Sequence, residues 1–219
     1  MIPKYTFTGD KNAPAIINSG KHSTPVWIQQ NWEQGEYAQF VRKNGCGHCC
    51  TAMALNLNGV KINPHEEFEY CRKMWGEPRM YEPVNEDNFL SVSGIEKVLV
   101  SFGVNAKCYG VPKGETLKCA KHIEDSLKDG KLVILVSEPS DRLPDNPFST
   151  GLHYVLAVSA DDDGKILVAN SSIRSAAVNG IQYTDYKTIA KVLWDGAQPG
   201  DYTWGRYDFT HTCGYVVVG

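Results

Sequence analysis

The stretch NGCGHCCTAM, from Asn44 to Met53, decides the fold of this chain. In it, Cys46 lies between two glycines, and a largely apolar, helix-forming run follows up to Gly59. The pattern predicts a helix that begins near Cys46 and ends at about Asn58. Unpaired N–H groups and partial positive charge at a helix N-terminus stabilise a thiolate and a developing oxyanion. We therefore predict that Cys46 is a reactive cysteine with a lowered pKa, rather than a structural cysteine of the core.

The composition indicates a globular protein of one large domain or two small ones. The 219 residues are 42% hydrophobic and 21% charged, which is sufficient to build a core. The net charge is -3 and no basic block occurs, which argues against nucleic acid or an anionic membrane as a partner. No stretch has the length of a membrane span, and the N-terminus lacks the apolar segment of a signal peptide. We therefore expect a soluble protein that is cytoplasmic or, if a leader has been removed, secreted.

The seven cysteines are an odd number, so at least one has no partner within the chain, and we expect most to be reduced thiols. Two other roles are open for the cysteines around Cys46. Cys46 and Cys49 have the spacing of a redox pair, and with His48 and Cys50 they could bind zinc. The segment before Cys46 lacks the strand of a thioredoxin-like protein, and no second pair of zinc ligands is evident. Neither role is the favoured hypothesis.

Periodicity and turn residues predict helices in the first half of the chain and strands in the second. Residues 1–24 are polar and are interpreted as a loose arm, and residues 25–30 resemble a short strand. Further helices are predicted at 65–75, 89–102, 116–128 and 188–193, and strands at 104–111, 132–136, 153–158, 165–170 and 215–218. An Asp-Gly turn joins two of these strands in a hairpin. The order predicts an α+β fold in which a helical lobe packs against an antiparallel sheet.

A nucleophilic cysteine needs a base within hydrogen-bond reach, and the base needs a group that orients it. His153 is the best candidate because it opens a strand directly after a loop rich in proline and glycine. In the hairpin, this strand lies beside the strand that Asn170 closes. Asn170 can therefore bind one ring nitrogen and leave the other facing Cys46. His211 is the main competitor, His48 follows Cys46 too closely to face the same cleft, and the other histidines fit surface positions.

An oxyanion site needs one more polar donor, and the amides Gln29 and Gln30 stand upstream of Cys46. Successive residues of a strand face opposite sides, so only one of the two can point into the cleft. Both could also be solvated amides. The candidate rim and walls of the cleft are the loops 76–88 and 138–151 with Trp75, Tyr81 and Phe148.

These features resemble the papain superfamily of cysteine peptidases over roughly residues 25–175. Cys46-Gly47-x-Cys49 is similar to the papain and cathepsin signature, and His153 and Asn170 follow in the order of that superfamily. The closer similarity is to the compact bacterial branch of bacteriocin-processing, double-glycine-leader peptidases. These carry an upstream Gln after a Pro-aromatic strand, then Gly-Cys-Gly before a small-residue helix.

The resemblance implies a papain-like cysteine proteinase fold in a single domain at 25–219, with a helical lobe at about 44–130 and a sheet lobe at about 131–219. It implies a cysteine peptidase that hydrolyses a peptide or protein substrate without a cofactor or a metal. Cys46 would supply the thiolate, His153 the general base and Asn170 the orienting group. Counting four residues on from Pro25 favours Gln29 as the oxyanion donor.

The chain departs from this pattern in two places. His48 and Cys50 replace the Pro and small polar residues usual in the compact branch, and Asn170 stands where nearer relatives commonly have Asp. The same fold also supports acyltransferase and amidase chemistry, or a non-catalytic binding module, and these alternatives stay open.

Overall fold

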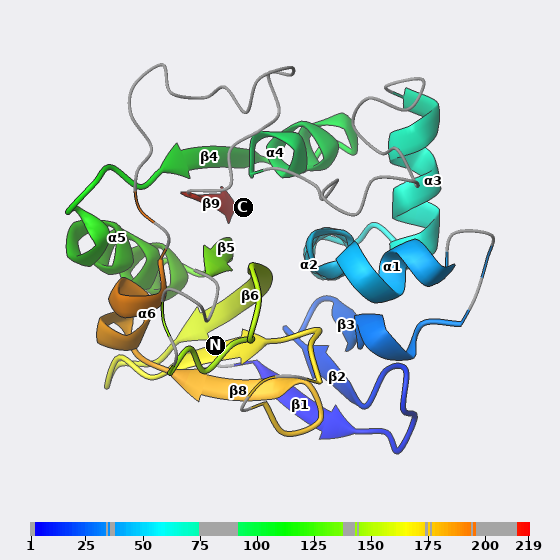
Figure 1. Ribbon diagram of the computed structural model, residues 1–219, viewed down its shortest axis with the longest axis horizontal. Helices are drawn as coiled ribbons and strands as arrows, with labels where there is room; N and C mark the ends of the chain where they lie inside the picture. Colours follow the sequence, from blue (N-terminus) through cyan, green and yellow to red (C-terminus); the bar gives the residue numbers. More distant parts are fainter. Residues whose placement is uncertain are drawn as a thin grey trace.

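The computed structural model describes residues 3–33, 35, 38–74, 92–137, 143, 145–173, 175, 177–193, 195 and 214–219. A six-stranded antiparallel sheet organises them, with its strands in the order β4-β9-β5-β6-β7-β8 (Figure 1). Its strands are β4 (Ala106–Gly110), β5 (Leu132–Ser137), β6 (His153–Ala160), β7 (Ile166–Ala169), β8 (Ile181–Thr184) and β9 (Gly214–Val218). The C-terminal strand β9 therefore lies inside the sheet, between β4 and β5.

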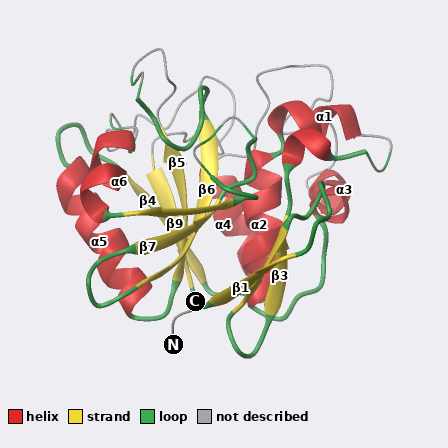
Figure 2. Cartoon of the chain, turned by 90° about the horizontal axis from the view of Figure 1, so that it is seen from below, coloured by secondary structure: helices red, strands yellow, loops and turns green. Residues whose placement is uncertain are grey.

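Helices cover both faces of this sheet (Figure 2). On one face lie α2 (Cys46–Leu57) and α4 (Val92–Ser101), and on the other lie α5 (Thr116–Lys128) and α6 (Tyr186–Val192). Because successive strand residues point to opposite faces, β5 contributes Ile134 to the core under α2 and Leu135 to the core under α5. Both faces are dry, which explains why β5 is a continuous apolar run. The sequence predicts α5 within the helical lobe, but it lies across the sheet from α2.

The central helix α2 is buried at all twelve of its positions. It is surrounded by β6, α4, α1 (Ala38–Asn44) and α3 (Pro64–Met74), and by the strand β3 (Ser23–Val26). Complete burial accounts for the absence of a charged residue anywhere along this helix. Packing on all sides of α2 therefore fixes the position of Cys46 at its N-terminus.

Residues 3–24 do not form the loose arm that the polar composition of residues 1–24 predicts. β1 (Lys4–Phe7), β2 (Ala15–Asn18) and β3 pair as a second, three-stranded antiparallel sheet. In β2, Ala15 and Ile17 are fully buried in the core around α2, whereas Ile16 is exposed. The prediction is wrong because these short strands pair as successive hairpins and bury alternate residues in the core around α2, despite their polar surroundings. β3 also continues across residue 25, the predicted start of the main domain.

Most predicted elements of the remaining chain are confirmed within a few residues. The helix predicted from Cys46 to about Asn58 spans Cys46–Leu57, and the one predicted at 116–128 has those bounds. β8 and α1 were not predicted. Among the described residues, no helix combines the length and apolar character needed to cross a membrane.

Candidate active site

Cys46 is the first residue of α2, and Gly45 is its N-cap. Gly45 has no room for a side chain, because an added Cβ would overlap the carbonyl oxygen of Val41 in the middle of α1. The glycine therefore lets α1 pass into α2 with almost no loop between them. Cys49 N donates to the Gly45 carbonyl at 2.8 Å, which closes the first turn of α2. This turn places the Cys46 side chain, 6% exposed, at the N-terminal end of a buried helix.

His153 is the first residue of β6, as predicted, and Asn170 directly follows β7. The two strands pair antiparallel, so their ends bring these side chains together. The Nε2 atom of His153 lies 2.9 Å from Oδ1 of Asn170, and both side chains are buried. An amide oxygen only accepts, so this bond places the proton on Nε2 and leaves Nδ1 as the acceptor nitrogen. The predicted pairing of His153 with Asn170 is present in the structure.

Asn170 is itself held on three sides. Its Nδ2 donates to the Phe148 carbonyl at 3.0 Å and lies 3.4 Å from Oε1 of Gln182 on β8. Its Oδ1 also accepts from the backbone N–H of Ser172 at 3.0 Å. The amide oxygen therefore cannot rotate away from His153 without breaking several hydrogen bonds. Phe148, predicted as a cleft wall, is instead fully buried in the core under α5 and acts here through its carbonyl.

Gln29 and Gln30 lie in one turn of 3-10 helix, η1 (Gln29–Asn31), rather than at the end of a strand. The alternation expected for a strand is wrong, and both residues line the same cavity as Cys46. They differ in burial, because only Gln29 is buried. Its Oε1 accepts from Ser171 Oγ at 3.2 Å, and its Nε2 makes only long contacts of 3.5 Å to the carbonyls of Arg42 and Lys43.

A cavity of about 360 Å³ joins these residues. Its lining comes from η1, the end of α1, the start of α2 and the segment that leads into β6: Gln29, Gln30, Lys43, Asn44, Cys46, Ser149, Thr150, Gly151, Leu152, His153 and Tyr154. The backbone N–H of Tyr154 also donates a hydrogen bond to the Cys46 sulfur, which ties the start of β6 to the start of α2. The cavity is large enough for a small part of a polymer chain, such as a few residues of a peptide.

Burial raises the pKa of the Cys46 thiol, although backbone N–H groups of Tyr154, Gly47 and Cys46 itself act in the opposite direction. The lowered pKa predicted from the helix N-terminus is therefore wrong for this structure, because removal from water outweighs the helix end. Burial also lowers the pKa of His153 to about 4, although the hydrogen bond that His153 donates to Asn170 acts in the opposite direction. Both shifts favour a neutral thiol and a neutral imidazole over a thiolate–imidazolium pair.

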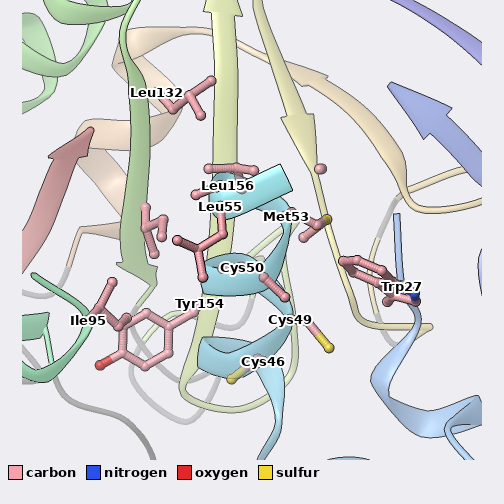
Figure 3. Close-up of a cluster of buried hydrophobic side chains, with 14 of the residues drawn as sticks. Trp27, Cys46, Cys49, Cys50, Met53, Leu55, Ile95, Leu132, Tyr154 and Leu156 are labelled. Carbon is pink, nitrogen blue, oxygen red and sulfur yellow. The ribbon is translucent and has the colours of Figure 1, made fainter. Parts of the chain in front are cut away.

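Cys49 and Cys50, on the same helix as Cys46, are buried in the core and form no disulfide. Figure 3 shows the Cys46 sulfur on the side of α2 that faces Tyr154, whereas the Cys49 sulfur lies on the opposite side. This arrangement is unsuited to a redox pair between Cys46 and Cys49, which needs adjacent sulfurs. His48 also points away from the cavity, as its spacing from Cys46 predicts, and contacts Glu67 on α3.

The structure thus brings together four of the predicted site residues: Cys46, His153, Asn170 and Gln29. His211, Trp75, Tyr81 and the loop 76–88 lie outside the described residues. Sequence reasoning missed Ser171, which holds Gln29, and the N–H of Tyr154. Ser171 is adjacent to Asn170 in the chain, but only the tertiary packing of η1 against the segment after β7 reveals its partner.

No family of known sequences matches the chain, and no curated protein matches it either. Solved structures do match by shape. A protein from Bacillus anthracis described as a C39-like peptidase is 12% identical, with a TM-score of 0.50, and the match covers 88% of this chain and 92% of that one. The peptidase domain of Streptococcus ComA, a bifunctional ABC transporter, is 8% identical, with a TM-score of 0.44 and 80% and 91% of the chains covered.

A double-glycine-motif protease of an AMS/PCAT transporter, solved with its leader peptide, is 14% identical, with a TM-score of 0.41 and 79% and 82% covered. At these identities the similarity concerns the fold. This chain likewise combines helices with an antiparallel sheet. Cys46 lies at the start of the central helix and His153 at the start of a strand. The chain therefore shares the fold of the C39-like peptidase from Bacillus anthracis, in agreement with the α+β, papain-like fold expected from the sequence.

Proposed function

We propose that the protein is a cysteine peptidase that hydrolyses a peptide bond in the cavity at the start of α2. Cys46 is the nucleophile and His153 the general base. Asn170 orients His153, and Gln29 donates to the oxyanion. No metal or cofactor takes part in this reaction.

One observation carries the proposal. The hydrogen bond between His153 Nε2 and Asn170 Oδ1 fixes the imidazole ring and leaves Nδ1 as its acceptor nitrogen. His153 and Cys46 line the same cavity. A nucleophile, a base and a group that orients the base are the three parts that acyl transfer requires. The hydrogen bond from the Tyr154 backbone N–H to the Cys46 sulfur supports the proximity of Cys46 and His153, because Tyr154 directly follows His153.

The reaction proceeds in two halves. The Cys46 sulfur attacks the substrate carbonyl carbon while the thiol proton moves to Nδ1 of His153, which forms a C–S bond and an oxyanion. The C–N bond then breaks, and the imidazolium returns its proton to the leaving amine. A water molecule attacks the thioester with its proton passing to His153, the C–S bond breaks, and the thiol regains the proton. The products are a carboxylic acid and an amine, and the enzyme is unchanged.

The oxyanion forms at the N-terminal end of α2. The first backbone N–H groups of a helix have no intrahelical acceptor, so they can donate to it. The Nε2 of Gln29 is a second donor, because its present contacts to the Arg42 and Lys43 carbonyls are at the limit of hydrogen-bond length. The Ser171 hydroxyl holds the amide oxygen of Gln29, which fixes the direction of its NH₂ group.

The pKa values favour proton transfer during attack rather than a resting ion pair. A His153 whose pKa is about 4 is neutral at pH 7 and can accept a proton. A thiol whose pKa is raised by burial keeps its proton until a substrate carbonyl is in place. A protonated thiol is also less susceptible to oxidation than a thiolate.

The test is hydrolysis of a diverse peptide library in H₂¹⁸O, read by mass spectrometry. We expect cleavage with one ¹⁸O in the new carboxyl group, abolished in Cys46→Ala and largely retained in the matched buried-thiol variant Cys50→Ala. Equal loss in both variants with the fold intact would contradict the assignment of the nucleophile. Products joined to an added amine without ¹⁸O would indicate an acyltransferase instead. A wild-type protein that cleaves no peptide would favour a binding module on this fold.

A further inference from the structure

Three metal-binding side chains meet in the core beside α2, outside the proposed active site. His48 lies on α2, and Glu67 and Cys71 lie one helical turn apart on the same face of α3. All three are fully buried. One ligand atom from each, a ring nitrogen, a carboxylate oxygen and a sulfur, lies within 4.8 Å of the other two.

Their contacts centre on the Glu67 carboxylate. One of its oxygens contacts Nδ1 of His48, and the Cys71 thiol donates to the other at 3.2 Å. The His48 ring also packs edge-on against Phe68 of α3, with ring centroids 5.1 Å apart. A carboxylate in a dry core is costly unless a positive charge or a metal compensates it. Among the ion pairs of the described residues, the partner of Glu67 is His48, and no Lys or Arg pairs with it.

We propose that His48, Glu67 and Cys71 form a zinc site that joins α3 to α2. Nitrogen, sulfur and carboxylate oxygen are the ligand types that zinc accepts, whereas calcium and magnesium take oxygen alone. The nitrogen–oxygen contact requires one proton between His48 and Glu67, and the thiol of Cys71 carries a second. One Zn²⁺ replaces these two protons, so the total charge of the buried cluster does not change.

This inference does not depend on the proposed peptidase activity. The sequence offers His48 as a zinc ligand with neighbouring cysteines, but the structure supplies Glu67 and Cys71 from α3 instead. The site would hold the helix that carries Cys46 against its neighbour. The fourth position of a tetrahedral zinc ion falls to a water molecule or a further side chain.

The experiment uses the full chain with Cys46→Ala, so that metal cannot bind the proposed nucleophile. Because the site is buried, the protein is unfolded and refolded with Co²⁺ or with a chelator. We expect one cobalt per chain with a thiolate-to-cobalt charge-transfer band, and a higher unfolding midpoint when Zn²⁺ is used. The band should disappear with Cys71→Ala added and persist with Cys119→Ala, a matched buried thiol on α5.

No charge-transfer band in the Cys46→Ala protein, or a band that survives Cys71→Ala, would overturn the proposal. If Cys71→Ala does not fold, X-ray absorption of zinc in the Cys46→Ala protein decides the matter. We expect a mixed shell with sulfur at about 2.3 Å and nitrogen or oxygen at about 2.0–2.2 Å. A shell of light atoms alone would show that the three side chains form only a hydrogen-bonded cluster.

Discussion

Acid should destabilise this fold through His153. Burial lowers the pKa of His153 from the ordinary value of 6.5 to about 4. Between these two values the unfolded chain binds a proton that the folded chain does not, so stability falls as the pH falls through this range. Above pH 6.5 the residue is neutral in both states and contributes no pH dependence. Each pKa unit corresponds to about 1.4 kcal/mol, which gives a loss of about 2 kcal/mol at pH 5 and about 3 kcal/mol at pH 4.

Urea unfolding at pH 7 and at pH 5 measures this loss, with His153→Gln beside the wild type. Carboxylates also titrate in acid, so the informative quantity is the difference between the two proteins in their change of unfolding free energy. We expect the wild type to lose about 2 kcal/mol more than His153→Gln. His22→Gln, which alters a histidine away from the cavity, is the control for the loss of a histidine as such. If His153→Gln and the wild type respond alike, His153 is not a buried neutral imidazole and the proposed base is wrongly described.

Three further predictions concern the same site. Asn170→Ala should lower kcat less than His153→Ala, because Asn170 orients the ring and does not transfer the proton; an equal loss in steady-state kinetics would refute this order. Gln29→Ala should lower kcat by about 10²–10³-fold with little change in KM, and a change confined to KM would mean that Gln29 only binds substrate. Gly45→Ala should lower the unfolding free energy by about 1–3 kcal/mol in urea, since its Cβ overlaps Val41, and an unchanged value would show that α1 can shift.

The elements that carry the site could be predicted because their signals are local. Apolar positions at helical spacing define α5 at the bounds found, and an Asp-Gly turn between apolar runs defines the β6–β7 hairpin. The hairpin alone places His153 beside Asn170. The glycines around Cys46 likewise mark the start of α2. These features need no knowledge of the rest of the chain.

The parts that could not be predicted depend on contacts between distant segments. β1 and β2 pair as a local hairpin, but burial of Ile17 in the core that contains α2 anchors them, and no short window of sequence reveals that burial. Ser171 meets Gln29 across 142 residues of chain. The pKa of Cys46 follows from burial, which a sequence pattern at a helix end does not measure. Charge and polarity of a segment predict its solvation, but not its tertiary partners.

The central claim is that Cys46 is a nucleophile assisted by His153. Alkylation by a small thiol reagent across pH, followed by mass spectrometry at each cysteine, tests it most directly. The account predicts that Cys46 is modified faster than the buried thiols Cys71 and Cys119, and that His153→Ala slows Cys46 alone. If Cys46 reacts no faster than Cys71 and Cys119, or if His153→Ala leaves its rate unchanged, the pair is not functional and the peptidase assignment is contradicted.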